Sequence, residues 1–118
     1  MKVHDYEKLF VWQKSMDLVA EIYSLTKLFP QSELYGLTSQ MKRASASVPS
    51  NIAEGSRRST KKDFCHFLVF ALGSASELET QINIARKLNF CSAAESARAE
   101  ALVIEVMKMF NRLIEINK

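Results

Sequence analysis

The fold of this chain is decided by residues 64–88, which read FCHFLVFALGSASELETQINIARKL. Apolar side chains recur in this stretch every three or four positions, at Phe64, Phe67, Leu68, Ala71, Ala75, Leu78, Ile82 and Ala85. This spacing predicts an amphipathic helix, and Thr60 and Asp63 just before it have the spacing of a capping box. Gly73 lies inside the helix, where glycine costs about 1 kcal/mol relative to alanine, so we expect another helix to cross closely there.

The same periodicity predicts three more helices. The first starts near Leu9 and ends at Pro30, and the second covers residues 32–54, with Gly55 as its C-terminal cap. The last begins at Ser92 with a second capping box. Each helix is joined to the next by a short connection.

The number of breaker residues agrees with a few long helices. The 118 residues include only 3 Gly and 2 Pro, whereas sandwiches and barrels need a turn residue every few positions. We therefore expect an all-α fold, an antiparallel up-down-up-down four-helix bundle that forms a single domain over residues 1–118. Pro49 falls inside the second helix and lacks a backbone donor, so it should kink this helix or split it near Ser47.

The last helix carries two adjacent apolar rows, which is more than one bundle core requires. One row is formed by Leu102, Val106, Met109, Leu113 and Ile116. The spare row is formed by Val103, Met107, Phe110 and Ile114. We expect the spare row to face another subunit, which predicts a homo-oligomer.

The composition, with 47% hydrophobic and 25% charged residues, is that of an ordinary globular protein. No apolar run approaches the length of a membrane span, and residues 1–5 show no signal-peptide core, so we expect no membrane association. Cys65 and Cys91 lack metal-site spacing and are too few for a disulfide framework. The sequence therefore predicts a reduced, cytoplasmic protein.

No arrangement of residues typical of an active site is evident. His4 and His66 are the two histidines, and Cys65 beside His66 cannot pair with it, because adjacent helical residues point about 100° apart. Glu77 and Glu79 diverge on a helix for the same reason, and the chain has neither a phosphate-binding glycine loop nor a Glu-x-x-His pair. We predict a protein that is not an enzyme and binds no metal or cofactor.

Positive charge is concentrated in one part of the chain. The net charge is +3, but residues 40–62 have a net charge of +5, and the rest has −2. The cations in this part are Lys42, Arg43, Arg57, Arg58, Lys61 and Lys62. Together they predict contact with RNA or DNA phosphates, although solvated cations that complement a helix C-terminus are an alternative. Because no aromatic residue interleaves the cations, we expect weakly sequence-specific, salt-dependent binding without base stacking.

A polar row follows one face of the second helix. If the second and third helices form a hairpin, facing residues have numbers that add to about 117, which places Gln40 near Glu77 and Arg43 near Ser74. This register predicts an Arg43–Glu77 pair. The expected network contains Gln40, Arg43, Asn51, Glu54 and Glu77. It is either a structural network or solvated face, or a functional groove or oligomer-lining surface.

Several motifs resemble one bacterial family. They are LFVWQK (9–14), FPxxExYGLTxQ (29–40), Arg43-Ala44, SVPxNIAEG (47–55), Phe67-Leu68 and AxGSxxEL (71–78). These motifs resemble the four helix bundle protein family, also called 23S ribosomal RNA intervening-sequence proteins or S23-type proteins. A related branch is the accessory variability determinant of diversity-generating retroelements, which partners a reverse transcriptase and binds nucleic acid.

The resemblance implies a four-helix bundle that assembles as a ring-like homopentamer and is not an enzyme. It implies a structural role for Asn51, Ile52, Glu54 and Gly55, and a nucleic-acid role for Arg43, Arg57 and Arg58. The sequence and the resemblance together predict an oligomeric RNA-binding or accessory protein. The alternative is a protein-interaction scaffold that binds a reverse transcriptase or another protein without nucleic acid.

Overall fold

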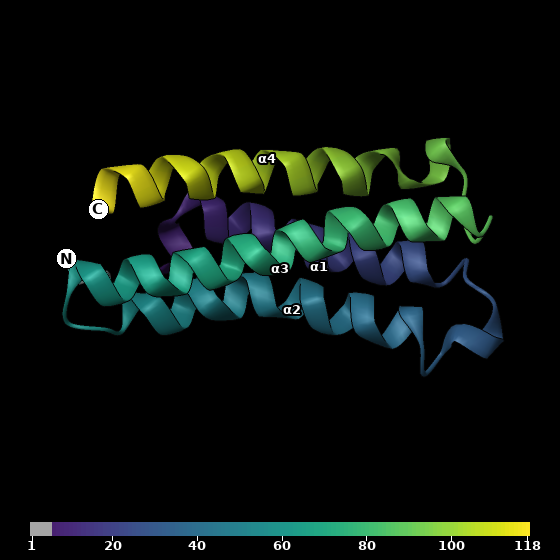
Figure 1. Ribbon diagram of the computed structural model, residues 1–118, viewed down its shortest axis with the longest axis horizontal. Coiled ribbons are helices and arrows are strands. Elements are labelled where there is room, and N and C mark those ends of the chain that lie inside the picture. Colours follow the sequence, from purple (N-terminus) through teal and green to yellow (C-terminus); the bar gives the residue numbers. More distant parts are fainter. Residues whose placement is uncertain (1–5) are drawn as a thin grey trace.

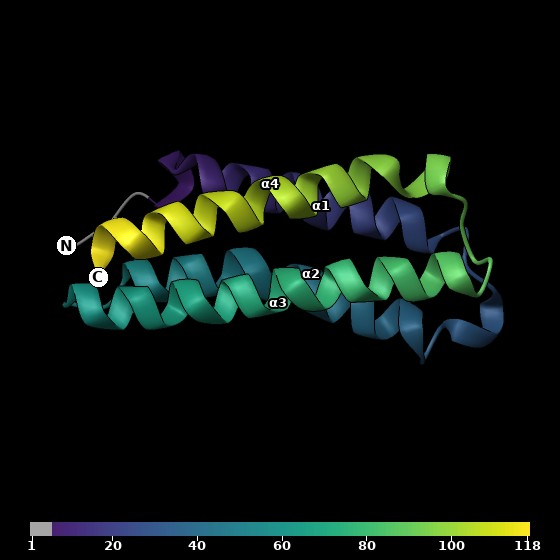
Figure 2. The same ribbon diagram turned by 45° about the horizontal axis from the view of Figure 1, so that its top comes forward.

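The computed structural model describes residues 6–118, which form four long α-helices. They are α1 (Phe10–Thr26), α2 (Leu37–Ser56), α3 (Lys61–Lys87) and α4 (Ala93–Asn117), with short 3₁₀ helices at Tyr6–Lys8 and Gln31–Glu33. Successive helices run in opposite directions along a body that measures 44 × 23 × 20 Å (Figures 1 and 2). The prediction of an all-α four-helix bundle is confirmed. No helix within residues 6–118 has the length and apolar character needed to cross a membrane.

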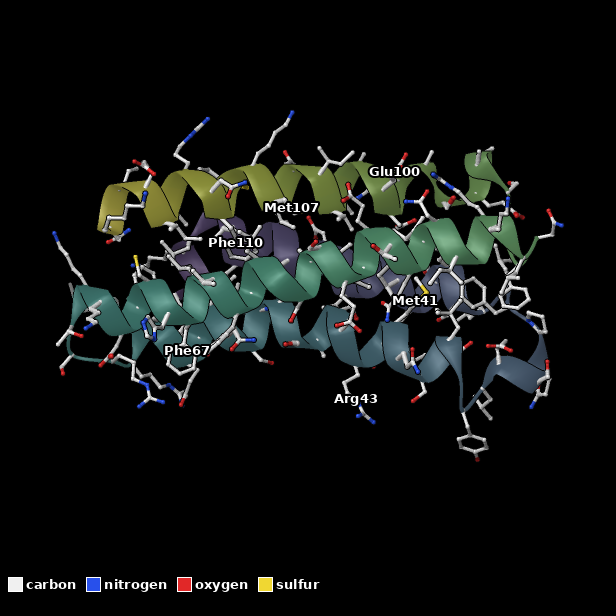
Figure 3. All side chains as sticks on the ribbon, in the orientation of Figure 1. Met41, Arg43, Phe67, Glu100, Met107 and Phe110 are labelled. Atoms are coloured by element: carbon white, nitrogen blue, oxygen red, sulfur yellow. The ribbon has the colours of Figure 1, made fainter. Side chains whose placement is uncertain are left out.

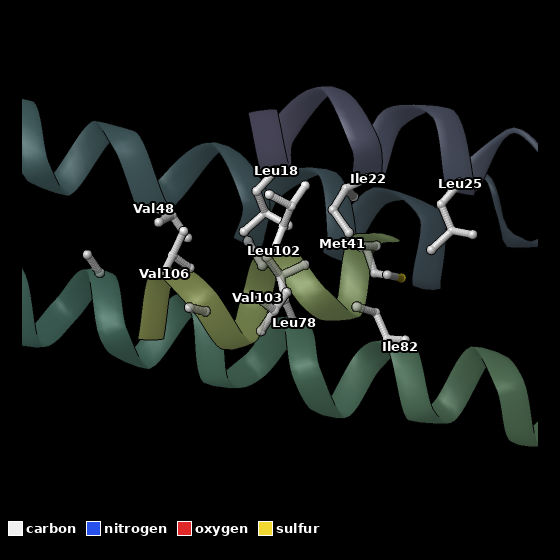
Figure 4. Packing of buried hydrophobic residues seen from close by; sticks show 14 of the residues in the cluster. Leu18, Ile22, Leu25, Met41, Val48, Leu78, Ile82, Leu102, Val103 and Val106 are labelled. Atoms are coloured by element: carbon white, nitrogen blue, oxygen red, sulfur yellow. The ribbon is translucent and has the colours of Figure 1, made fainter. Parts of the chain in front are cut away.

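The helices form a closed ring of neighbours. Each helix packs against the one before and the one after it, and α4 closes the ring against α1. The buried side chains point to the common axis, where residues such as Ile22, Met41, Leu78 and Val106 come from four different helices (Figure 4). Residues from all four amphipathic faces therefore contribute to one core.

The spare apolar row of α4 lies inside this core. Val103 and Phe110 are both 0% exposed, and Met107 and Ile114 are partly buried against the core. Figure 4 shows Val103 directed at Leu78 of α3. The expectation that this row faces another subunit is wrong, because α4 lies against both α1 and α3 and needs an apolar row for each.

Helix α2 is continuous through Pro49, so the split expected near Ser47 does not occur. The proline is buried, and two polar side chains just after it donate to backbone carbonyls of the preceding turn. Ser50 Oγ donates to the Ala46 carbonyl at 2.7 Å, and Asn51 Nδ2 donates to the Ser47 carbonyl at 2.8 Å. A change of helix direction at Pro49 stays a prediction.

The ends of the helices follow local sequence signals. Thr60 Oγ1 accepts the Asp63 N–H at 3.1 Å, and Ser92 forms a full capping box with Glu95, as predicted. Helix α3 ends at Lys87 with Leu88 as its C-cap, and Asn89, at the next position, has a φ of 61°. A left-handed residue is usual at this position of a helix C-terminus, where asparagine can replace glycine.

Two glycines have roles opposite to those expected from the sequence. Gly55 does not cap α2, because the helix continues to Ser56. Instead, α3 approaches α2 closely at Gly55. A Cβ at this position would lie 2.7 Å from Phe67 Cβ and 3.2 Å from Phe64 Cδ1. Gly73 is exposed, and a Cβ there would meet nothing within 4 Å. The close crossing expected at Gly73 is therefore wrong, and the close approach lies at Gly55.

This difference makes the two glycines a matched pair for mutagenesis. Gly55→Ala should lower the free energy of unfolding by about 1–3 kcal/mol, because α2 and α3 must move apart. Gly73→Ala should raise it by up to about 1 kcal/mol, because alanine favours the helix and has space. Urea unfolding followed by circular dichroism measures both changes, and equal shifts of the same sign would contradict this packing.

Candidate functional site

The turn between α2 and α3, residues 57–62, carries four exposed cations and is here named the basic turn. Arg57 ends α2, where its N–H donates to the carbonyls of Glu54 and Gly55. Thr60 caps α3, so Lys61 and Lys62 are the first two residues of that helix. Their backbone N–H groups are at a helix N-terminus, where partial positive charge adds to that of the side chains.

One of these cations is engaged within the protein. Arg58 Nη2 donates to Glu54 Oε1 at 2.8 Å, and its guanidinium lies 4.8 Å from the centre of the Phe67 ring. Among residues 6–118, Arg57, Lys61 and Lys62 have no hydrogen-bond or ion-pair partner through their side chains. Glu54 therefore neutralises Arg58, and three cations remain available.

The other two predicted cations lie elsewhere. Lys42 and Arg43 are on α2 about 20 Å along the helix axis from Arg57. Lys42 Nζ lies over the ring of Tyr23 in α1, 4.9 Å from its centre. The six cations expected as one surface are therefore two separate groups, because α2 holds them at different heights on the bundle.

A polar groove runs between α2 and α3, with a volume of about 440 Å³. Its lining residues are Tyr35, Ser39, Gln40, Arg43, Ala44, Ser47, Ser74 and Glu77. The structure thus brings together Gln40, Arg43 and Glu77 of the predicted network. Glu54 is outside the groove and pairs with Arg58.

One hydrogen bond crosses the groove, between two serine residues, and others run along its two helices. Ser47 Oγ lies 2.9 Å from Ser74 Oγ, and Asn51 Nδ2 donates to Ser47 Oγ at 3.0 Å. Glu77 Oε2 accepts a hydrogen bond from Gln81 Nε2 at 3.0 Å.

The Arg43 side chain has no hydrogen-bond or ion-pair partner within residues 6–118. The predicted Arg43–Glu77 ion pair therefore does not form. Figure 3 shows the Arg43 side chain directed away from the bundle.

The register of the α2–α3 hairpin differs from the expected one. Facing pairs such as Ser47–Ser74 and Gly55–Phe67 have numbers that add to 121 or 122, not 117. The sum is larger because the two helices are not level at the turn that joins them. In Figure 1 the first turn of α3 projects beyond the end of α2, so each α2 residue faces a residue further along α3 than expected. Lys61 and Lys62 lie in this projecting turn, at one tip of the molecule.

A pair of phenylalanines not expected as part of the site begins at the basic turn, where Phe67 contacts Arg58, and continues along α3 to Phe70. Phe67 stacks with Arg58, and its ring centre lies 5.8 Å from that of Phe70 in an edge-to-face contact. Phe70 is 57% exposed. The helical period of α3 could have revealed that an aromatic ring shares a side of the helix with a cation, because Lys62, His66 and Phe70 are four residues apart.

The titratable side chains near α3 and α4 are scattered. Within residues 6–118, no group of three or more His, Cys, Asp or Glu side chains could hold a metal ion, and His4 lies outside the described residues. His66 is exposed, and half-buried Cys65 directs its Sγ at the Ile114 carbonyl, 3.7 Å away. Burial raises the pKa of the Cys91 thiol, which therefore stays protonated at neutral pH.

Comparison with known proteins gives a family and a fold. The sequence profile of the 23S rRNA-intervening sequence protein family matches residues 7–112. Among solved structures, the chain is similar to a protein of unknown function from the S23 ribosomal protein family of Bacteroides thetaiotaomicron, with a TM-score of 0.81 and 22% sequence identity. That match covers 88% of this chain and 97% of the other, and it supports the fold. No curated protein matches the chain in sequence.

The two arginines Arg43 and Arg86 should respond differently to substitution. Arg86 bridges α3 and α4, donating to Glu100 Oε2 at 2.8 Å and to Ser96 Oγ at 2.7 Å. We expect Arg86→Gln to lower the free energy of unfolding by about 1 kcal/mol, and Arg43→Gln to change it by less than about 0.5 kcal/mol. Thermal unfolding measures both. A large loss for Arg43→Gln would show that Arg43 has a structural role.

Proposed function

The chain belongs to the 23S rRNA-intervening sequence protein family, and from this premise we propose that it is an oligomeric RNA-binding or accessory protein without enzymatic activity. The family predicted from the sequence motifs is thereby confirmed. The observation that carries the proposal is the set of three exposed cations at the tip of the α2–α3 hairpin whose side chains have no partner in the described part of the chain, residues 6–118. Neither the family description nor the description of the structural relative names a catalytic activity.

The basic turn has the properties of a phosphate-binding surface. Lys61 and Lys62 lie in the first turn of α3, which projects beyond the end of α2, and exposed Arg57 lies at that end of α2, so one extended polyanion can contact all three. Asp63 is the acidic residue of the first turn of α3, and the net charge of the turn stays positive when it is counted. Contacts of this kind position a nucleic acid without reading its sequence.

RNA is the ligand that the family description favours, since it names 23S rRNA. Ribosomal RNA is cytoplasmic in bacteria, so a cytoplasmic location forms part of the proposal. The alternative is a scaffold for a protein partner, with cations that play no part in binding.

The proposed homo-oligomer needs an apolar surface other than the α4 row. The outer side of α1 offers one, with Met16 and Tyr23 each 43% exposed and Trp12 and Val19 partly exposed between and beside them. These residues are spaced by four, three and four, so they form a continuous stripe along the helix. We assign the subunit contact to this stripe, and the pentameric state follows from the resemblance alone.

RNA binding is tested by removing charge from the basic turn. The triple variant Arg57→Gln, Lys61→Gln, Lys62→Gln should bind structured RNA more weakly at low salt. The slope of log K against log salt concentration should fall by about two, because each phosphate contact contributes roughly 0.7–0.9. Filter binding at several salt concentrations gives both quantities.

The matched control removes the same charge elsewhere. Lys27→Gln, Lys87→Gln, Lys108→Gln alters three exposed lysines away from the basic turn and should leave the slope within error of the unmodified protein. Absence of RNA binding at low salt, or equal weakening in both triple variants, contradicts the proposal. A protein partner retained at high salt and after nuclease treatment would then support the scaffold.

The oligomer is tested by sedimentation. The chain mass is 13.4 kDa, and we expect a multiple of this mass at micromolar concentration. Met16→Glu should dissociate the assembly, because it places a charge in the α1 stripe. Ile84→Glu on α3 is the control, since Ile84 has a similar exposure of 41% and lies outside the stripe. A monomeric mass for the unmodified protein refutes self-association.

A further inference from the structure

We propose that the outer face of α3 beside the basic turn binds the bases of single-stranded RNA, with Phe70 as the stacking surface. The proposal rests on the proposed function, because the basic turn holds the phosphates of the same strand. It replaces the expectation, drawn from the sequence, that base stacking is absent.

Phe70 is an exposed aromatic ring held in a defined orientation. It is 57% exposed although it lies near the middle of α3. Its edge-to-face contact with Phe67, at an interplanar angle of 86°, engages the ring on one side and leaves the rest in water. Phe67 is itself covered by the guanidinium of Arg58, which adds a planar cation to the same surface.

The cations and the ring lie on one side of α3. Lys62, His66 and Phe70 are all exposed and four residues apart, so they follow one line along the helix. Lys62 and Phe70 are about 12 Å apart along the helix axis. A strand whose phosphates contact the basic turn can therefore lay its next bases over His66 and Phe70.

Gly73 keeps the surface beside Phe70 open. It follows Phe70 by three residues, is exposed, and has empty space where a Cβ would be. A glycine inside a helix is less stable than alanine, and no packing within residues 6–118 explains its presence. The bare backbone lets a flat base approach the helix. Glu77, four residues further on, repels phosphates and so marks the end of the surface.

This chemistry selects unpaired bases. In a duplex the bases are already stacked on each other, so a protein ring reaches them only at ends, loops and single-stranded segments. Stacking of one base on an aromatic side chain changes affinity by about 5- to 150-fold on alanine substitution and depends little on base identity. The expected ligand is therefore single-stranded RNA of weak sequence preference.

The test compares three probes of equal length on the full chain: a short oligoadenylate, an abasic oligomer with the same phosphates, and a duplex RNA. We expect Phe70→Ala to weaken oligoadenylate binding about five-fold or more and to leave abasic and duplex binding unchanged. Phe70→Trp should retain oligoadenylate binding, and its fluorescence should change with oligoadenylate but not with the abasic oligomer, after subtraction of the Trp12 signal from the unmodified protein. Fluorescence anisotropy of labelled probes measures the affinities.

Tyr35→Ala is the control, because Tyr35 is 93% exposed and lines the polar groove rather than the basic turn. If Phe70→Ala binds oligoadenylate normally while the basic-turn triple variant binds weakly, the stacking surface is refuted and the phosphate contact stands. If the unmodified protein binds none of the probes, the proposed function fails as well. If Phe70→Ala changes the sedimenting mass and weakens all probes equally, Phe70 contacts a second copy and the proposal is overturned.

Discussion

The close packing of α2 against α3 at Gly55 is the constraint on which the rest of this structure depends. With no side chain at Gly55, Phe64 and Phe67 approach the α2 backbone, and this contact sets the relative height of the two helices. The resulting offset lets the first turn of α3 project beyond α2 (Figure 1). It also places Phe67 beneath Arg58, so that one packing contact determines both the position of the cations and their aromatic neighbours.

The helices could be predicted from the sequence because their signals are local. Apolar periodicity located all four helices, and side-chain caps at Thr60 and Ser92 fixed two of their starts. What the sequence could not reveal was how many neighbours a helix has. The two rows of α4 looked like one more than a core requires, but a helix that packs against both α1 and α3 buries most of both rows, except Ile116 near its end, which is 68% exposed.

The candidate site could be predicted by residue type and only in part by position. Gln40, Arg43 and Glu77 do meet in one groove, since a hairpin of two helices brings any such face together. The offset of α2 and α3 shifts facing residues by four to five positions, more than one helical turn, and brings Glu77 nearly level with Arg43, but the Arg43 side chain is directed away from the bundle and does not pair with it. The same offset, together with the length of α2, separates Lys42 and Arg43 from the basic turn. The helical period of α3 places Phe70 in line with Lys62, but the contact of Phe67 with Arg58 depends on how α2 packs against α3, which the sequence does not show.

The projecting turn of α3 has a consequence for any assembly of this chain. If copies of the chain assembled with cyclic symmetry, equivalent points of all copies would lie in one plane, so every basic turn would lie at the same height along the ring axis. One turn offers three available cations and a weak, salt-sensitive contact, whereas a ring offers several along one circumference. An RNA that touches two of them binds the second at a high effective concentration, and its residence time then depends on the spacing of the copies more than on the strength of any single contact.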